Sequence, residues 1–187
     1  VLKLFGVHLI FSVLITLIQP TVAQFLEDVT LYHLYLLVFF AGAELFFLSN
    51  LTVSYGDQMY RLNLIALREY KQQGKEGRPE RLPFAAWKGF ALAAIAEAPA
   101  LILAVVLQIM GEGAPTLVRL FTHLWYAAFS RLTQVWPDTV GIQMVVEGLL
   151  TIGVLGAGYL YGRRRRRKMA VQIYKSRQAM RQAKEKK

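Results

Sequence analysis

Residues 140–168 read VGIQMVVEGLLTIGVLGAGYLYGRRRRRK, an apolar run that ends in five arginines and a lysine. The apolar part, residues 140–161, has roughly the 20 residues that a helix needs to cross about 30 Å of hydrocarbon. Because lipid offers no hydrogen-bond partner to a bare peptide group, a segment of this kind is expected to be helical. Basic residues directly after it are typical of the cytoplasmic end of a membrane span.

Three further stretches of the chain have the same apolar character. The composition agrees, because 55% of the 187 residues are apolar and the mean hydropathy is +0.36, more than is usual for a soluble domain of this length. The sequence therefore predicts an all-α polytopic membrane protein, with a four-helix transmembrane bundle over 1–161 and a basic tail over 162–187. The predicted spans cover residues 4–22, 31–51, 86–110 and 140–161.

The Lys and Arg residues fall almost entirely on one side of these spans. Of the 22, seven lie between residues 50 and 88 and twelve lie in the tail from 162, whereas the segment 20–30 has none. Because basic residues accumulate in cytoplasmic segments, we expect the loop 52–85 and both termini to be cytoplasmic. This bias explains the net charge of +10 better than specific nucleic-acid binding does, since no aromatic platform is interleaved with the basic residues.

Residues 115–136 form a further apolar segment, which contains Arg119 and Arg131. Each arginine at mid-membrane depth would cost roughly 2.5–3.5 kcal/mol, and a fifth crossing would place the basic tail outside. We therefore predict an amphipathic helix in the outer interface; a shallow re-entrant hairpin is the alternative. The expected apolar face is Leu117, Leu120, Phe121, Leu124, Ala128 and Leu132, and the aromatic residues expected at headgroup level are Trp125, Tyr126 and Trp136.

The segments around the first two spans carry two further expectations. Helical periodicity continues past the second span to about Tyr70, with Gly74 as a stop. The first span has a second interpretation, because Lys3, an apolar run and Thr21-Val22-Ala23 resemble a secretory leader with its cleavage site. We interpret this segment as a membrane helix. The chain begins at Val1 without Met, which suggests that a few residues precede it.

Three spans hold one carboxylate each, at Glu44, Glu97 and Glu147. Ionisable groups inside a bilayer are rare and usually face the bundle interior, so each is a candidate functional residue. At a rise of about 1.5 Å per residue they would lie about 10, 15 and 21 Å from the cytoplasmic edge. This arrangement would form a staircase for a proton or cation. The alternative is structural, with protonated carboxyls hydrogen-bonding across helices.

Further polar residues lie on the same helix faces as some of these candidates or on faces of their own. Residues four apart share a face, and we add His8, Gln143 and Thr151 to the carboxylates as candidates for an ion or proton pathway. The two faces are His8, Ser12 and Thr16 on the first span and Gln143, Glu147 and Thr151 on the fourth.

Pro99 is expected to break the third span. It follows Glu97 by two residues, lacks a backbone donor and frees the carbonyl of Ile95. A broken helix beside an acidic group is one way in which membrane proteins build a substrate or ion site.

The residue types exclude several kinds of chemistry. The chain has no cysteine, so it has no disulfide, thiol nucleophile or cysteine-ligated metal. His8 is expected to make an interhelical or interfacial bond; a metal site with two carboxylates is the alternative, but no ligand spacing supports it. Glu44 and Glu97 as paired catalytic groups would need a substrate cleft. We therefore predict no metal, no cofactor and no enzymatic activity.

Small residues recur along the third and fourth spans and end in Gly158-x-x-x-Gly162. Such patterns let helix backbones approach closely. Packing within the chain is the simpler interpretation, and self-association through Gly158 and Gly162 is the alternative.

The basic tail has two interpretations. Each cation near an anionic leaflet is worth about 1 kcal/mol, which favours a topology determinant that contacts anionic lipids. The alternative is a docking arm for a cytoplasmic polyanion such as an acidic protein or ribosomal RNA. Residues 169–187 are expected to be helical, and the basic run itself is Arg163, Arg164, Arg165, Arg166, Arg167 and Lys168.

Short motifs lie after the second span, in the interfacial segment and at the end of the fourth span. They are Ser49-Asn50 with Tyr55-Gly56, Arg119-Leu120 with Phe129, and Gly158-Tyr159-Leu160-Tyr161-Gly162. In these motifs the chain resembles a family of small, uncharacterised four-span membrane proteins from Gram-positive bacteria, over residues 49–168. The resemblance implies the topology and a bacterial inner membrane, and it implies no reaction.

These observations together favour a non-enzymatic membrane subunit or adaptor. It would pack against other membrane helices and present a basic surface to the cytoplasm. A proton- or cation-coupled transport component that uses the intramembrane carboxylates is the alternative function.

Overall fold

The structure is a computed structural model that describes residues 1–24, 35–75, 82–127 and 140–185. Every element within these residues is helical, which confirms the predicted all-α class. In chain order they are α1 (Leu2–Ala23), the π-helix η1 (Leu36–Ala41), α3 (Gly42–Gln72), α4 (Ala86–Met110), the 3₁₀ turn η2 (Gly111–Gly113), α5 (Thr116–Trp125) and α7 (Val140–Glu185).

Three described helical segments are long and apolar enough to cross a membrane: Val38–Gln72, Ala86–Gly113 and Val140–Met180. A shorter apolar segment, Leu2–Ile18, lies in α1. The predicted third span, 86–110, coincides with α4. Helical structure continues past the second predicted span as expected, because α3 ends at Gln72 and Gly74 then adopts a φ of 70°.

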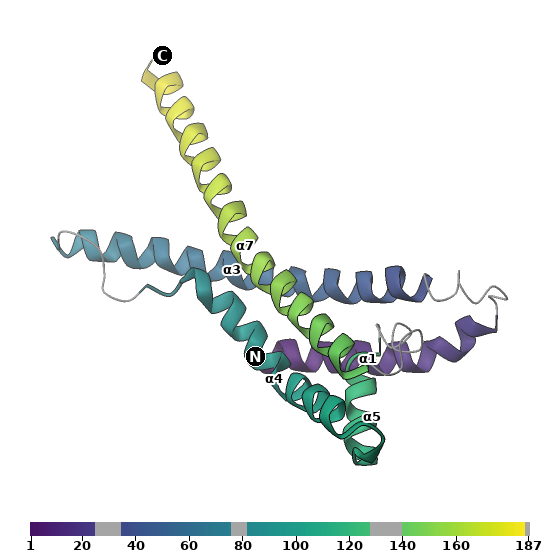
Figure 1. The fold of residues 1–187 in the computed structure, drawn as a ribbon. Helices are drawn as coiled ribbons and strands as arrows, with labels where there is room; N and C mark the ends of the chain where they lie inside the picture. The colour runs from purple at the N-terminus through teal and green to yellow at the C-terminus, as the bar shows by residue number, and fades with distance from the viewer. Residues whose placement is uncertain (25–34, 76–81, 128–139, 186–187) are drawn as a thin grey trace.

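The helix α7 is the central element, since it packs along both α3 and α4. Figure 1 shows α7 crossing α3 and then extending well beyond the other helices to the C-terminus. The expected tail helix is therefore not separate. A single α-helix runs from Val140 through the basic run to Glu185.

Glycines on α7 allow both close contacts. On the side of α3, a Cβ atom at Gly162 would collide with the backbone oxygen of Val53, and one at Gly158 would lie 2.5 Å from Oγ1 of Thr52. On the side of α4, a Cβ atom at Gly156 would enter the ring of Phe90. Small residues let helices approach closely. Gly158 and Gly162 thus pack within the chain, and self-association through them remains a prediction.

The buried side chain of Asn63 on α3 makes hydrogen bonds to the turn that leads into α4. Its side-chain oxygen accepts a hydrogen bond from the backbone nitrogen of Phe84 at 2.7 Å, and its amide nitrogen donates to the Phe84 oxygen at 3.4 Å. The Phe84 ring then stacks on Tyr159 of α7, with centroids 4.8 Å apart. One amide side chain thereby positions the start of α4 against both long helices.

One prediction about helix shape is wrong. The expected helix break at Pro99 is absent, because α4 continues as an α-helix through this residue. On α5 the exposed fractions of Leu117 and Leu120 are 78% and 64%, whereas Thr122 and Trp125 are buried. The leucine face expected in the membrane interface is therefore not covered by the described helices, and another face of α5 packs inward. The rest of the predicted helix 115–136, beyond residue 127, lies outside the described residues.

The close approach of α3 and α7 predicts a specific effect of a single methyl group. Gly162→Ala is expected to destabilise the detergent-solubilised protein, because the new Cβ atom meets α3 backbone that cannot move aside without separating the helices. The loss should be about 1–3 kcal/mol in a denaturation series.

Gly153→Ala is the matched control, since Gly153 also lies in α7 and a Cβ atom there meets nothing within 4 Å. It should be neutral or slightly stabilising, because alanine is the better helix former. Equal stability of the two variants would contradict the proposed contact.

Candidate functional site

A buried polar cluster joins four helices. His8 lies on α1, Glu44 in the first turn of α3, Glu97 on α4 and Trp125 at the end of α5. The exposed fractions are 5% for His8, 2% for Glu44 and 1% for Glu97. These three groups are candidates that the sequence singled out, and the structure brings them together around one imidazole ring.

Both ring nitrogens of His8 face carboxylate oxygens. Nε2 lies 3.3 Å from Oε1 of Glu44, and Nδ1 lies 3.3 Å from Oε1 of Glu97. Nε2 also lies 2.9 Å from the backbone oxygen of Trp125, and because a carbonyl only accepts, Nε2 must carry a proton. Nδ1 of His8 and Oε1 of Glu44 have no hydrogen-bond partner among the described residues, so the two 3.3 Å approaches are close contacts without hydrogen-bond geometry.

Trp125 completes the cluster from the end of α5. Its indole Nε1 donates to Oε2 of Glu97 at 2.9 Å, and its ring stacks on His8 with centroids 4.2 Å apart and planes 13° apart. Its backbone oxygen accepts a second hydrogen bond, from Oγ of Ser12 at 3.0 Å. The last carbonyls of a helix have no partner within the helix, and here two α1 side chains satisfy one of them.

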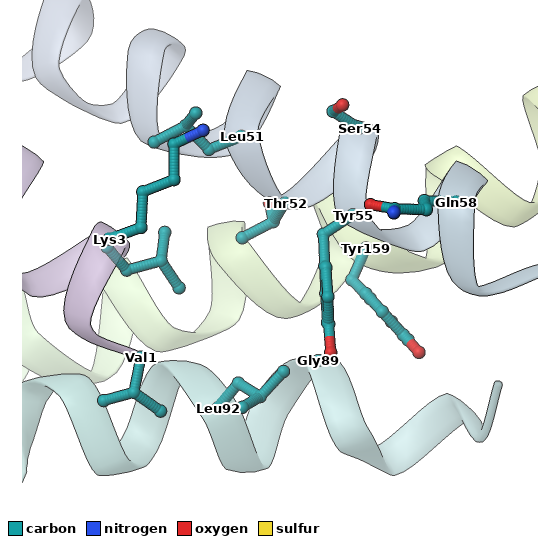
Figure 2. A pocket seen from close by; sticks show the side chains of 11 residues that line it. Val1, Lys3, Leu51, Thr52, Ser54, Tyr55, Gln58, Gly89, Leu92 and Tyr159 are labelled. Carbon is teal, nitrogen blue, oxygen red and sulfur yellow. The ribbon is translucent and has the colours of Figure 1, made fainter. Parts of the chain in front are cut away.

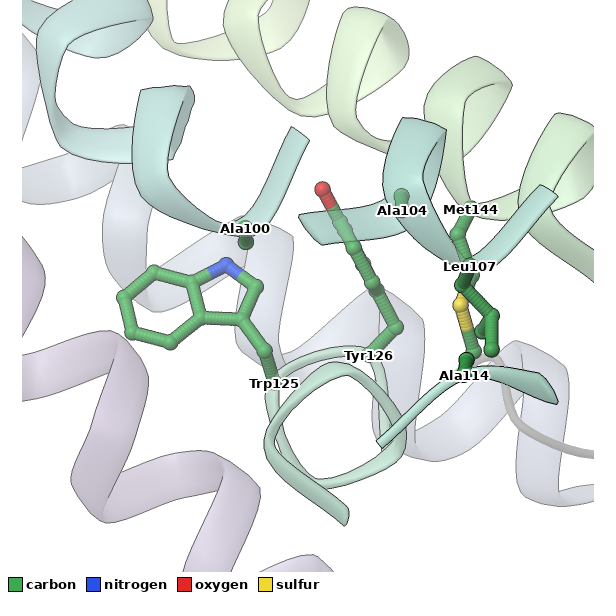
Figure 3. Packing of buried hydrophobic residues seen from close by; sticks show 7 residues of the cluster. All are labelled: Ala100, Ala104, Leu107, Ala114, Trp125, Tyr126 and Met144. Carbon is green, nitrogen blue, oxygen red and sulfur yellow. The ribbon is translucent and has the colours of Figure 1, made fainter. Parts of the chain in front are cut away.

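The position of Trp125 corrects an expectation. Trp125 and Tyr126 were predicted at headgroup level, but each is only 1% exposed. Figure 3 shows both rings packed beside Ala100 and Ala104 of α4, whose small side chains leave room for them. Trp136 lies outside the described residues. The sequence signal for this inward face was the spacing of Val118, Phe121, Thr122 and Trp125.

Glu147 forms a second buried position, on α7. It is 5% exposed, and neither of its carboxylate oxygens has a hydrogen-bond partner among the described residues. Thr151 is also buried but donates to the backbone oxygen of Glu147, at 3.0 Å, and not to the carboxylate. Gln143 is half-buried on the same face.

The structure brings two of the three carboxylates to one ring. Glu44 and Glu97 flank a single imidazole, whereas Glu147 lies on α7, which crosses α3 in Figure 1. The depths of the three groups in a membrane stay a prediction. Within the described residues no group of three or more His, Cys, Asp or Glu side chains is arranged to hold a metal ion.

A cavity of about 330 Å³ lies apart from this cluster, between the start of α1, α3, α4 and α7. Figure 2 shows Lys3, Tyr55 and Tyr159 among the residues that line it. None of the buried carboxylates lines this cavity. We therefore assign the candidate chemistry to the polar cluster.

The basic run divides into held and free residues. Arg163 lies over the rings of Tyr60 and Phe84, with its Cζ atom 5.8 and 5.4 Å from their centroids. Nη1 of Arg166 lies 3.9 Å from Oδ2 of Asp57 on α3. The exposed members are Arg163, Arg164, Arg165, Arg167 and Lys168.

Comparison of the chain with protein-family models, with curated proteins and with solved structures finds no match in any of the three. The functional argument therefore depends on the residues and geometry of this chain alone.

The cluster predicts a large effect of removing its central ring. His8→Ala should destabilise the protein by about 3–5 kcal/mol, because it leaves two buried carboxyl groups without their shared partner. Thermal or denaturant unfolding in detergent measures this loss.

Thr16→Val is the control on the same helix, since Thr16 is exposed and its hydroxyl donates to the backbone oxygen of Ser12 in the same helix. It should change stability by less than about 1 kcal/mol. If His8→Ala is no more damaging than Thr16→Val, the cluster does not hold the four helices together.

Proposed function

We propose that this chain is an integral membrane adaptor that crosses the bilayer four times, through α1, α3, α4 and α7, with both termini in the cytoplasm of a bacterium. Its role is to pack in the membrane and to present the basic end of α7 to a cytoplasmic partner. The observation that carries this proposal is the length of α7, which continues as one helix from Val140 to Glu185.

The projecting part of α7 has no packing partner of its own among the described residues. The side chains that the structure describes between residues 171 and 180 are all exposed. They include apolar groups that water solvates poorly. The exposed fractions are 48% for Val171, 54% for Ile173, 62% for Tyr174 and 60% for Met180.

Distance from the membrane favours a cytoplasmic partner over lipid alone. At about 1.5 Å per residue, Val171 lies about 13 Å beyond Gly162 along the helix axis. Surface charges are screened beyond about 8 Å at physiological salt. Lipid headgroups therefore attract the first arginines, whereas the residues from Val171 onward are available to another molecule.

The mixture of charge and apolar surface favours a protein with an acidic, partly apolar face. Ribosomal RNA would match the cations but not Val171, Ile173 and Tyr174. The held residues Arg163 and Arg166 fix the base of the arm on α3, so the free cations point outward from a rigid support.

A four-residue neutralisation tests the proposal. Changing Arg164, Arg165, Arg167 and Lys168 to Gln should abolish co-purification of the cytoplasmic partner, because the exposed cations supply the attraction. The measurement is affinity purification from detergent-solubilised membranes, followed by mass determination of the complex.

The control carries the same charge change at Arg61, Arg68, Lys71 and Lys75, on the cytoplasmic end of α3 and the turn after it. This variant should retain the partner. The proposal fails if both variants keep the partner, or if the parent protein binds anionic vesicles and no protein.

A proton- or cation-coupled transport component is the second candidate function. It is favoured by the placement of His8 between Glu44 and Glu97, which gives a proton two acceptors within 3.3 Å of one ring. Glu97→Gln would then abolish flux in proteoliposomes, whereas an adaptor would keep its partner through this change.

A further inference from the structure

Glu147 and Tyr126 are among the buried groups whose side-chain oxygens have no hydrogen-bond partner within the described residues. Glu147 is 5% exposed and Tyr126 is 1% exposed. Both carboxylate oxygens of Glu147 and the hydroxyl oxygen of Tyr126 lack a hydrogen bond among the described residues. Buried side-chain polar atoms in proteins nearly always have a partner, so these three oxygens together indicate a missing ligand.

The two groups come from different elements, and the Tyr126 hydroxyl approaches α7 at the residue that follows Glu147. A Cβ atom on Gly148, the residue after Glu147, would lie 2.7 Å from the hydroxyl oxygen of Tyr126. Figure 3 shows the Tyr126 hydroxyl pointing away from α5 and into the surrounding helices. Burial, with the carboxyl groups of Glu97 and Glu147, raises the pKa of the Tyr126 phenol, so the hydroxyl stays neutral.

The acidic group at this place is a single carboxyl, that of Glu147. Glu97 is already engaged by His8 and by the indole of Trp125, and the carboxylate of Glu147 has no hydrogen-bond donor in the described part of the chain. An ionised carboxylate buried without a countercharge is strongly unfavourable. One positive charge balances it.

The number and type of free oxygens favour a metal cation over a proton. A proton would bind one carboxylate oxygen and leave the other without a partner. A bound cation would supply a partner to both carboxylate oxygens, with the phenol oxygen of Tyr126 as a further candidate ligand. A monovalent ion matches the charge of one carboxylate, whereas a divalent ion would leave a positive charge buried.

We propose that Glu147 and Tyr126 form a binding site for one monovalent metal cation inside the bundle, with Na⁺ as the best-matched ion. The site is independent of docking by the basic arm. It requires only that α5 returns into the bundle and places Tyr126 beside α7.

Carbodiimide labelling tests the site on the full-length protein. Dicyclohexylcarbodiimide is an apolar reagent whose central carbon is attacked by a protonated carboxyl, and an oxygen-to-nitrogen acyl shift then leaves a stable N-acylurea. The adduct on Glu147 is measured by peptide mass spectrometry. Na⁺ at about ten times its Kd should slow labelling roughly tenfold by mass action, whereas choline should have no effect.

Two phenol variants make the test specific. Tyr126→Phe keeps the ring but removes the oxygen ligand, so a higher Na⁺ concentration should be needed for the same protection. Tyr159→Phe is the control, because Tyr159 is a buried phenol on α7 that stacks on Phe84. In the Tyr159→Phe variant, the same Na⁺ concentration as in the parent protein should protect Glu147 from labelling.

Equilibrium dialysis with radioactive sodium gives a second readout that does not depend on carbodiimide reactivity. The parent protein should bind one Na⁺, and Glu147→Gln, with unchanged elution in size-exclusion chromatography, should bind none. The proposal is overturned if the parent binds no sodium in dialysis, or if Na⁺ and K⁺ both leave labelling of Glu147 at the rate seen in choline. It is also overturned if Tyr126→Phe is protected at the same Na⁺ concentration as the parent.

Discussion

The carbonyl oxygen of Trp125 belongs to a residue buried in the helix bundle and must find its donors there, and this constraint determines the rest of the arrangement. His8 and Ser12 of α1 supply the two missing donors. His8 in turn contacts Glu44 and Glu97, and Glu97 accepts from the indole of Trp125. Because each buried group needs the next, the cluster fixes α1, α3, α4 and α5 relative to one another.

The contacts of α7 with α3 and α4 depend on the close fit of the helices and not on polar side chains. Apolar side chains gain little by leaving lipid for protein, so helix contacts in a membrane depend on close packing. The glycines of α7 provide this packing against α3 and α4. Because the first half of α7 is packed in this way, it serves as a rigid base for the projecting second half. The buried region thereby supports the docking function that we propose.

The sequence predicted the bounds of α4 and the stop at Gly74, because apolar length and glycine chemistry are local properties. It did not predict the place of Trp125 or the inward face of α5. Periodicity indicated the apolar leucine face of α5 and not the face that packs against the other helices. Thr122 and Trp125 face inward instead, since the end of α5 finds its hydrogen-bond partners in α1 and α4. Such partners are distant in the chain and leave no local signal.

Burial of Trp125 is the most direct test of this account. The chain has three tryptophans, so Trp87→Phe with Trp136→Phe leaves Trp125 as the only one. Quenching of its fluorescence should be weak with iodide and with lipids brominated near the headgroup, because the indole is enclosed by α1, α4 and α5. Strong quenching by either reagent in the folded protein would place Trp125 at the membrane surface and contradict the buried cluster.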